Sequence, residues 1–224
     1  FHEPARRRQL SGSGWLARRI AASGDASWSY RAVIEAALYD PDEGFYGSGR
    51  GRAGRRGDFL TSPEVGPLFG AVLARALDSW WAELGCPDPF TVVECGAGVG
   101  TLARGVLAAA PACRPRYLAV ERAAPLRAEH PPGVTSLAEL PSDPVGVGVV
   151  IANELLDNLP FAVLERVDDA WHELLVGPDG CELVGPAVGS ERVRGAGLER
   201  APAGARIPLQ DAGARWLERA VATL

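Results

Sequence analysis

The sequence predicts an α/β fold built around a parallel β-sheet, and three observations support this. Three apolar segments rich in β-branched residues have the length of buried strands: residues 90–95, 116–121 and 145–152. Helical patterns precede and separate them, as α/β folds require. Each segment ends in glycines or polar side chains, which such folds gather at the carboxyl edge of the sheet to bind ligands.

The composition is that of a globular chain that forms one large domain, or a domain with an appendage. Of its 224 residues, 47% are hydrophobic and 23% are charged, which excludes general disorder. The net charge of −5 argues against non-specific nucleic-acid binding. All basic residues are arginine, and both lysine and methionine are missing, which indicates a GC-rich bacterial genome. Because the first residue is not methionine, we expect a trimmed chain.

The cysteines and histidines predict no metal site. Cys86, Cys95, Cys113 and Cys181 form no C-x-x-C pair, and the three histidines are scattered. Four free thiols in a reducing compartment are the simplest account. No run approaches the ~18 apolar residues of a membrane helix, and the start lacks the apolar core of a signal peptide. We therefore expect a cytoplasmic protein without membrane insertion.

Ahead of the first strand, the chain is predicted to be mainly helical. A short helix is expected near residues 15–21, and a second begins at Ser27 or Ser29 and stops at Asp40-Pro41. Residues 44–56 are dense in glycine and arginine. They suit a surface loop, with binding of an anionic partner as the alternative.

A longer helix is predicted from Pro67 to about Leu84. The residues before it have the composition of a helix start, with Thr61 or Ser62 followed by Pro63 and Glu64. Apolar residues recur along this helix at helical spacing and are predicted to face the core: Leu68, Val72, Leu73, Ala76, Leu77 and Trp80.

The glycine-rich turn after the first strand points to a particular cofactor. Gly96, Gly98 and Gly100 have the spacing G-x-G-x-G, whereas dinucleotide sites use G-x-G-x-x-G. Glu94 precedes the first glycine by two residues. A carboxylate there suits a cation better than a pyrophosphate. The pattern is similar to motif I of methyltransferases that use S-adenosylmethionine, whose cofactor carries an ammonium and a sulfonium group. An ordinary glycine-rich turn is the alternative.

The second predicted strand ends in Glu121, which lies 21 residues after Gly100. Near this interval α/β folds place an acidic residue on a ribose. Two ribose hydroxyls can both donate to one carboxylate, so the residue type is suitable. The alternative is a surface glutamate at the end of a strand.

A polar segment follows the last apolar strand. Asn153, Glu154 and Asp157 are expected at the carboxyl edge of the sheet. A helical turn would place Glu154 and Asp157 on one face, where they could act on a substrate or merely cap a short helix. A short third strand at residues 134–137 is expected earlier, with a helix beginning at 137–140.

The rest of the chain is predicted to form a β-hairpin and a final helix. Residues 161–167 and 171–176 suit antiparallel strands around the turn Asp168-Asp169. Residues 177–204 suggest irregular structure with one further strand. The helix at 210–224 is expected to turn Ala214, Leu217, Ala220 and Val221 inward.

Several segments together resemble the MidA-like methyltransferases, whose mitochondrial member is an assembly factor of respiratory complex I. The blocks that carry the resemblance span nearly the whole chain, in the family's order: residues 37–41 with 44–46, 57–65, 67–70, 93–102 and 152–160.

The resemblance implies a Rossmann-like class I methyltransferase fold that binds S-adenosylmethionine. It also implies, for the mitochondrial member, symmetric dimethylation of an arginine in a complex I subunit. The matching motif implies that the methionine end of the cofactor is bound by Glu94 and by the glycine loop, which consists of Gly96, Ala97, Gly98, Gly100 and Thr101. Glu121 would hold the ribose, and Thr61, Ser62 and Pro63 would close over the cofactor. Asn153 would face both cofactor and acceptor.

Two carboxylates are the candidate catalytic groups. Glu154 and Asp157 can bind two nitrogens of a guanidinium and aim the third at the methyl group. Asp58 or Glu64 would further orient the acceptor. A small-molecule O- or N-methyltransferase on the same fold and a non-catalytic assembly factor that binds the cofactor are the rival functions. A protein substrate is the expected partner, and a homodimer stays open.

The resemblance also predicts how the chain is organised. Residues 1–88 form an N-terminal helical segment with a cofactor-covering loop, and residues 89–160 form the cofactor-binding core. Residues 161–224 form a hairpin insertion after the fourth strand and a final helix. Phe45, Gly66, Gly105 and Asn158 depart from the family's usual residues. The family continues beyond the final helix with another central strand, so we expect the chain to lack the C-terminal strands.

Overall fold

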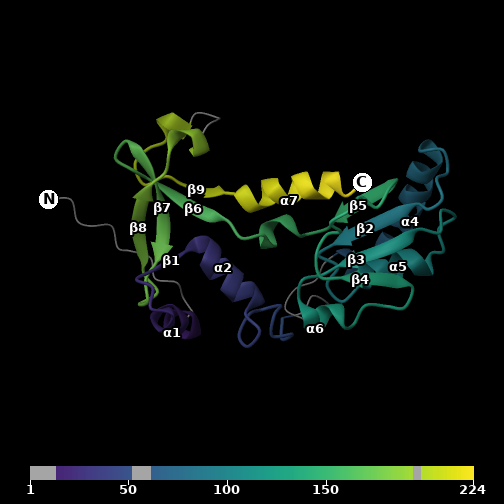
Figure 1. Cartoon of the computed structure of the whole chain (residues 1–224), viewed down its shortest axis with the longest axis horizontal. Coiled ribbons are helices and arrows are strands. Elements are labelled where there is room, and N and C mark those ends of the chain that lie inside the picture. The colour runs from purple at the N-terminus through teal and green to yellow at the C-terminus, as the bar shows by residue number, and fades with distance from the viewer. Residues whose placement is uncertain (1–13, 52–61, 194–197) are drawn as a thin grey trace. The chain divides into compact units, whose positions relative to one another are not determined.

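The computed structural model describes residues 14–51, 62–193 and 198–224. These residues form two compact units. One contains the described residues up to Ala37 together with Leu159–Ala214, and the other contains Leu38–Asn158 with Arg215–Leu224. Each unit has its own sheet (Figure 1). The three-part division expected from the sequence stays a prediction.

The second unit is built on the expected parallel sheet. Its strands are β2 (Thr91–Cys95), β3 (Arg116–Val120), β4 (Val134–Leu137) and β5 (Gly148–Ala152), in the spatial order β4-β3-β2-β5. All three pairings are parallel. Cys95 lies beside Val120 and Ala152, so the carboxyl ends of the central strands are level. Within the described residues, the far edge of β5 pairs with no strand.

Helices cover both faces of this sheet (Figure 1). On one face, α4 (Pro67–Glu83) and α5 (Thr101–Ala108) share a buried cluster with β2 and β3. On the other, Trp216 and Ala220 of α7 (Asp211–Ala222) pack with residues of β2, β3 and β5. The short helices α3 (Ser62–Val65) and α6 (Ala124–Arg127) lie before α4 and after β3. The central strands are therefore buried on both faces, which explains their continuous apolar sequence.

The predicted inward face of α4 is only partly correct. Leu77 is fully buried and Leu73 packs against the core, but Leu68, Val72 and Trp80 are 75%, 58% and 39% exposed. The helix instead turns small residues toward α5. Gly70 approaches Gly105 so closely that a Cβ on Gly70 would stand 2.5 Å from the Gly105 carbonyl carbon. Two helix backbones that cross this closely require small residues at the contact. The periodicity of apolar residues in the sequence does not indicate such a contact.

Two other expectations are wrong in whole or in part. In α7, Ala220 packs against the sheet as predicted, but the side chains of Ala214, Leu217 and Val221 are exposed, and Trp216 makes the other contact with the sheet. The helix expected to begin at residues 137–140 does not form, and turns follow β4 instead. Pro141 and Pro144 explain this, because proline disfavours helical geometry in the residue before it.

The first unit holds the predicted hairpin within a larger sheet. Strands β6 (Ala162–Val167) and β7 (Ala170–Val176) pair around Asp168-Asp169, as expected. Three further strands join them: β1 (Trp28–Ser29), β8 (Glu182–Ala187) and β9 (Arg206–Leu209). Buried Glu182 of β8 is paired with Arg206 of β9. Two 3₁₀ helices, η2 (Ser190–Val193) and η3 (Leu198–Arg200), lie between β8 and β9.

The N-terminal helices begin and end where the sequence indicated. Helix α1 (Gly14–Ser23) buries Leu16 and Ile20. Helix α2 (Tyr30–Tyr39) starts after Ser29, whose hydroxyl accepts a 3.2 Å hydrogen bond from the Ala32 N–H. This is the expected capping arrangement.

Candidate active site

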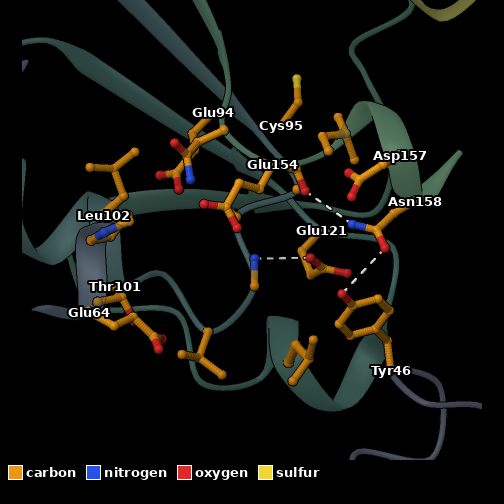
Figure 2. Close-up of a pocket in the computed structure, with 18 of the residues that line it drawn as sticks. Tyr46, Glu64, Glu94, Cys95, Thr101, Leu102, Glu121, Glu154, Asp157 and Asn158 are labelled. Carbon is orange, nitrogen blue, oxygen red and sulfur yellow. Dashed lines mark hydrogen bonds between the residues drawn. The ribbon is translucent and has the colours of Figure 1, made fainter. Parts of the chain in front are cut away.

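A cavity of about 360 Å³ opens at the carboxyl ends of the parallel strands (Figure 2). Its walls are the segments that follow β2, β3 and β5, joined by residues from the N-terminal side: Tyr39, Tyr46, Pro63 and Glu64. The volume is within the usual range for small-molecule and cofactor sites. This is the edge of the sheet at which the sequence placed its candidate residues.

The glycine turn after β2 brings bare main chain to this cavity. Gly96, Gly98 and Gly100 all have positive φ, at 71°, 55° and 80°. Gly98 lines the cavity, and a Cβ added to it would meet no protein atom within 4 Å. A ligand can therefore lie directly against the backbone at Gly98. Gly100 does not line the cavity but ends the turn before α5, packed against Pro131.

Glu94, in β2, lies at the inner end of the cavity and is only 4% exposed. The Tyr117 hydroxyl donates a 2.8 Å hydrogen bond to its Oε2. Burial raises the pKa of Glu94 to about 7, although hydrogen bonds from Tyr117 and the Ala103 N–H oppose the rise. A buried carboxylate of this kind gains most from a cationic ligand.

Glu121 lies just after β3 and faces the glycine turn. Its Oε2 accepts a 2.9 Å hydrogen bond from the Gly98 N–H, and Oε1 accepts one of 2.7 Å from the Ala123 N–H. Burial raises the pKa of Glu121, against the opposing effect of these bonds. The carboxylate therefore connects the ends of two strands at the cavity wall.

The polar segment after β5 also lines the cavity. Asn153, Glu154 and Asp157 are all in the lining, together with Asn158. The expected helical turn is shorter than predicted, because the 3₁₀ helix η1 spans only Leu156–Asn158. Glu154 precedes it with a positive φ of 53°, a conformation that costs a residue with a side chain energy. Glu154 and Asp157 are exposed, whereas Glu94 and Glu121 are buried.

On the N-terminal side, the structure places only part of the predicted segment. Pro63 and Glu64 line the cavity, while Ser62 is exposed and outside the lining. Asp58 and Thr61 lie outside the described residues. The Thr101 hydroxyl donates a 3.4 Å hydrogen bond to Glu64, whose pKa is raised by burial. Glu64 joins α3 to the start of α5.

The cavity has a strongly acidic lining. The described residues that line it include no arginine, lysine or histidine. They include five carboxyl groups, those of Glu64, Glu94, Glu121, Glu154 and Asp157. Such a site favours ligands that carry positive charge. Within the same part of the chain, no three histidine, cysteine or acidic side chains are grouped to hold a metal ion. No helix there is long and apolar enough to cross a membrane.

These features suit S-adenosylmethionine. Its amino and sulfonium groups are positive, its ribose presents hydroxyl donors, and bare main chain at Gly98 leaves room beside the turn. The comparison with protein families decides the matter. A family described as "putative S-adenosyl-L-methionine-dependent methyltransferase" matches residues 72–211.

The chain belongs to this methyltransferase family. Its relatives agree with the resemblance found in the sequence. A mitochondrial protein arginine methyltransferase NDUFAF7 homolog of Drosophila melanogaster is 31% identical over 74% of this chain and 45% of its own length. The Xenopus laevis protein arginine methyltransferase NDUFAF7 is 28% identical over 63% of this chain and 40% of its own. The chain thus spans less than half the length of these relatives.

Solved structures confirm the fold of the chain. A Burkholderia thailandensis protein crystallised with S-adenosyl-homocysteine superposes with a TM-score of 0.77 at 31% identity, over 95% of this chain and 59% of the other. A second structure from that organism gives a TM-score of 0.73 at 28% identity. The fold is the expected Rossmann-like class I methyltransferase fold, and the cofactor is S-adenosylmethionine.

The sequence indicated no role for several residues that line the cavity. Tyr39 and Tyr46 are the largest of them, and Leu126, Leu155 and Asn158 are others. Tyr46 belongs to one of the family blocks, yet nothing in its sequence neighbourhood indicates a ligand. Only the fold brings residues 39–46 to the carboxyl edge of strands, the first of which begins at Thr91.

Proposed function

We propose that this methyltransferase transfers methyl groups to an arginine side chain of a protein, such as a subunit of respiratory complex I. The observation that carries the proposal is that the described lining residues include five carboxyl groups and no basic side chain. A guanidinium is a planar cation whose nitrogens match carboxylates in pairs. The names of the Drosophila and Xenopus relatives, which are protein arginine methyltransferases, also support this acceptor.

In this proposal the buried acids serve the cofactor. Glu94 holds the amino end of its methionine part, Gly96, Ala97, Gly98, Gly100 and Thr101 form the turn around it, and Glu121 receives the ribose hydroxyls. Glu94 and Glu121 are 4% and 8% exposed, so both are shielded from water. Thr61, Ser62 and Pro63 close over the cofactor, and Asn153 contacts it from the end of β5.

The exposed acids serve the acceptor. Glu154 and Asp157 lie where a side chain of another protein can reach them. The cofactor would supply a methyl group bonded to its sulfonium sulfur, which would leave as a neutral thioether, so the protein contributes mainly positioning. Two carboxylates that bind the guanidinium localise its charge and direct one nitrogen, and one of them accepts the proton that this nitrogen gives up. Asn153, Glu64 and Asp58 orient the acceptor further.

Mass spectrometry of cellular proteins tests the acceptor. Cells that carry the gene, cells that lack it, and cells with Glu154→Gln/Asp157→Asn are compared for methylated arginines. We expect an arginine peptide methylated only with the wild-type gene. Asp143→Asn is the matched control, because Asp143 is exposed and outside the cavity lining.

The rival functions give different results in the same material. A methylated small molecule without any methylated arginine would identify a small-molecule methyltransferase. Binding of S-adenosyl-homocysteine with no methylated product of either kind would identify an assembly factor. A cytoplasmic location and a homodimer are further expectations, which cell fractionation and light scattering of the purified protein test.

A further inference from the structure

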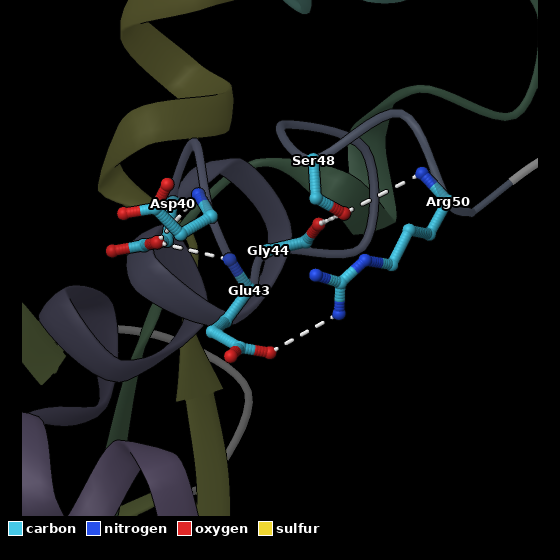
Figure 3. Close-up of polar contacts among 6 residues, drawn as sticks. Asp40, Glu43, Gly44, Ser48 and Arg50 are labelled. Atoms are coloured by element: carbon cyan, nitrogen blue, oxygen red, sulfur yellow. Dashed lines mark hydrogen bonds and ion pairs between the residues drawn. The ribbon is translucent and has the colours of Figure 1, made fainter.

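The segment of residues 40–51 is a turn held by hydrogen bonds within itself (Figure 3), and its Tyr46 lines the cavity. Asp40 is only 7% exposed, and its Oδ1 accepts hydrogen bonds of 3.0 and 3.1 Å from the N–H groups of Asp42 and Glu43. The Ser48 hydroxyl donates a 2.6 Å bond to the Gly44 carbonyl. These bonds connect the end of α2 to the turn and give it one conformation.

Close packing further restricts this turn. A Cβ on Gly44 would stand 2.4 Å from the Asp40 nitrogen, and one on Gly47 would stand 2.4 Å from the Tyr39 oxygen. A Cβ on Gly51 would stand 2.4 Å from the Phe45 ring. Because there is no space for even one added methyl group at these glycines, the turn is a fixed wall.

The turn presents Tyr46 to the cavity (Figure 2). The Tyr46 N–H donates a 2.8 Å hydrogen bond to the Leu38 carbonyl, which fixes its backbone. The Phe45 ring meets the Tyr46 ring edge-on at 4.9 Å between centroids, and the Tyr39 ring lies at 6.0 Å. The Arg122 guanidinium stands 4.4 Å from the Tyr39 ring centre. The cluster of the three aromatic rings therefore contacts Arg122, the residue that follows Glu121.

The Tyr46 hydroxyl begins a chain of hydrogen bonds to the unusual backbone at Glu154. It donates a 3.5 Å bond to Oδ1 of Asn158, and Nδ2 of Asn158 donates a 3.0 Å bond to the Glu154 carbonyl. Glu154 is the residue with a φ of 53°. The side chain of Tyr46 therefore helps to hold the segment after β5 in a conformation that it would otherwise favour less.

The electrostatic surroundings keep this hydroxyl protonated. Burial raises the pKa of Tyr46, and the nearby charges of Asp157, Glu121 and Glu154 raise it further, while its bond to Asn158 lowers it. Tyr46 is therefore a permanent donor among carboxylate acceptors at neutral pH.

We propose that Tyr46 is a positioning residue of the cofactor site. Its hydroxyl, through Asn158, holds the segment of Glu154 in place, and its ring closes the cavity beside Glu121. The proposal requires that the cofactor binds in this cavity, but it does not depend on the acceptor.

Calorimetry with S-adenosyl-homocysteine tests the hydroxyl. Tyr46→Phe removes it and keeps the ring, and we expect the Kd to rise about three- to tenfold, as the loss of one hydrogen bond predicts. Asn158→Ala should give a similar rise, and the double variant should bind no worse than the weaker single variant, because both act through one bond. Tyr30→Phe is the matched control. It removes a phenol hydroxyl that bonds to Glu182, outside the cavity lining, and should leave the Kd unchanged.

Two results would overturn the proposal. One is a Kd for Tyr46→Phe within twofold of wild type. The other is a double variant whose loss equals the product of the two single losses. Glu94→Gln, measured in parallel, distinguishes a failure of the role proposed for Tyr46 from a failure of the assumption that the cofactor binds in this cavity. If it also binds with unchanged affinity, the cavity is not the cofactor site and both fail; if it binds weakly while Tyr46→Phe does not, only the role of Tyr46 fails.

Nuclear magnetic resonance supplies a test that does not rely on affinity. In protein labelled with ¹³C at the tyrosine Cζ, the Tyr46 signal is assigned by its disappearance in Tyr46→Phe. We expect it to shift when S-adenosyl-homocysteine is added, while the Tyr30 signal stays in place. A Tyr46 signal that does not move at saturation would overturn the proposal. Tyr46→Leu, which also removes the aromatic wall, should weaken binding beyond Tyr46→Phe.

Discussion

Tyr117 donates a 2.8 Å hydrogen bond to Glu94 across two neighbouring strands, and both side chains are buried. Tyr117 pairs in register with Val92, two positions before Glu94, so the bond runs diagonally between β3 and β2. Burial raises the pKa of Glu94 to about 7 despite this bond. At neutral pH without a cationic ligand, the carboxyl group is therefore about half protonated.

Cofactor binding should consequently depend on pH. A positive amino group requires the ionised form of Glu94, so its binding displaces the proton. We expect the Kd for S-adenosyl-homocysteine to fall about tenfold between pH 6 and pH 8, with release of about half a proton at pH 7. Calorimetry in buffers of different ionisation enthalpy measures both quantities. Glu94→Gln should bind weakly with a flat profile, and a pH-independent wild type would contradict the assignment of Glu94.

Tyr117→Phe should move this profile. Without the hydroxyl donor the ionised carboxylate loses a hydrogen bond, so the pKa of Glu94 rises. A bond to a charged group stabilises it by about 1.5–3 kcal/mol, which corresponds to a displacement of about one to two pH units toward higher pH. The same pH series measures the displacement. Tyr30→Phe again serves as the control, and a profile that coincides with wild type would show that Tyr117 has no influence on Glu94.

Folding stability should change with pH in the opposite direction. The pKa of Glu94 is about 7 in the folded protein and 4.5 for an unperturbed side chain, so the folded state binds the proton more tightly. The stability from this group is complete below pH 4.5 and is lost as pH rises through 7. The loss is about 3 kcal/mol. Urea unfolding of wild type and Glu94→Gln at pH 5 and pH 8 measures most of this loss. Over that range the stability of Glu94→Gln relative to wild type should increase by about 2.5 kcal/mol. An equal difference at both pH values would contradict the burial of the charge.

The close approach of α4 and α5 predicts unequal effects of two similar substitutions. Gly70→Ala places a methyl group 2.5 Å from the Gly105 carbonyl carbon, so the helices must separate. We expect a loss of about 2 kcal/mol, the usual cost of overpacking. At Gly105→Ala the nearest atom is 3.3 Å away, and the gain in helix propensity of about 1 kcal/mol offsets the strain. Chemical denaturation measures both, and equal losses would show that the helices do not cross at these glycines.

The thiols should differ widely in reactivity. None of the four cysteines, all of which lie in the described part of the chain, forms a disulfide bond. Burial raises the pKa of Cys95 and Cys113 to about 12, whereas Cys86 is exposed. Iodoacetamide at pH 8 should modify Cys86 in the native protein and leave Cys95 and Cys113 intact, because the thiolate is the reactive form. Peptide mapping measures this, with urea-unfolded protein as the control. Rapid labelling of Cys95 in native protein would show that its thiol, which belongs to the cavity lining, is accessible to the reagent and contradict its burial.

Much of the fold could be predicted because local patterns carry it. The buried strands appear as continuous apolar runs, and the structure confirms each of them at β2, β3 and β5. The hairpin of β6 and β7 was evident from alternation around Asp168-Asp169. In contrast, β1 has only two residues, Trp28 and Ser29, and exists because β7 offers it a partner. No local signal marks such a strand.

The helix faces show the limit of periodicity. In α4 the apolar residues form two faces, and only the one with Leu73 and Leu77 meets the sheet. Leu68 and Val72 are also apolar, yet they remain exposed. Amphipathic spacing shows that a helix buries a face, but the choice between two apolar faces depends on its neighbours.

By itself, the sequence predicted the cofactor class, through the spacing of Gly96, Gly98 and Gly100 after a strand that holds Glu94 and through the resemblance of the surrounding blocks to one family. It also placed Glu121 and the Asn153–Asp157 segment at the same edge, because parallel strands end level with one another. Only the tertiary structure showed that Tyr46 lines the same cavity and that burial raises the pKa of Glu94. It also showed that the backbones of α4 and α5 approach closely at Gly70 and Gly105. The first group depends on local geometry that residue types specify. The second depends on burial and contact between distant segments, which exist only after the chain has folded.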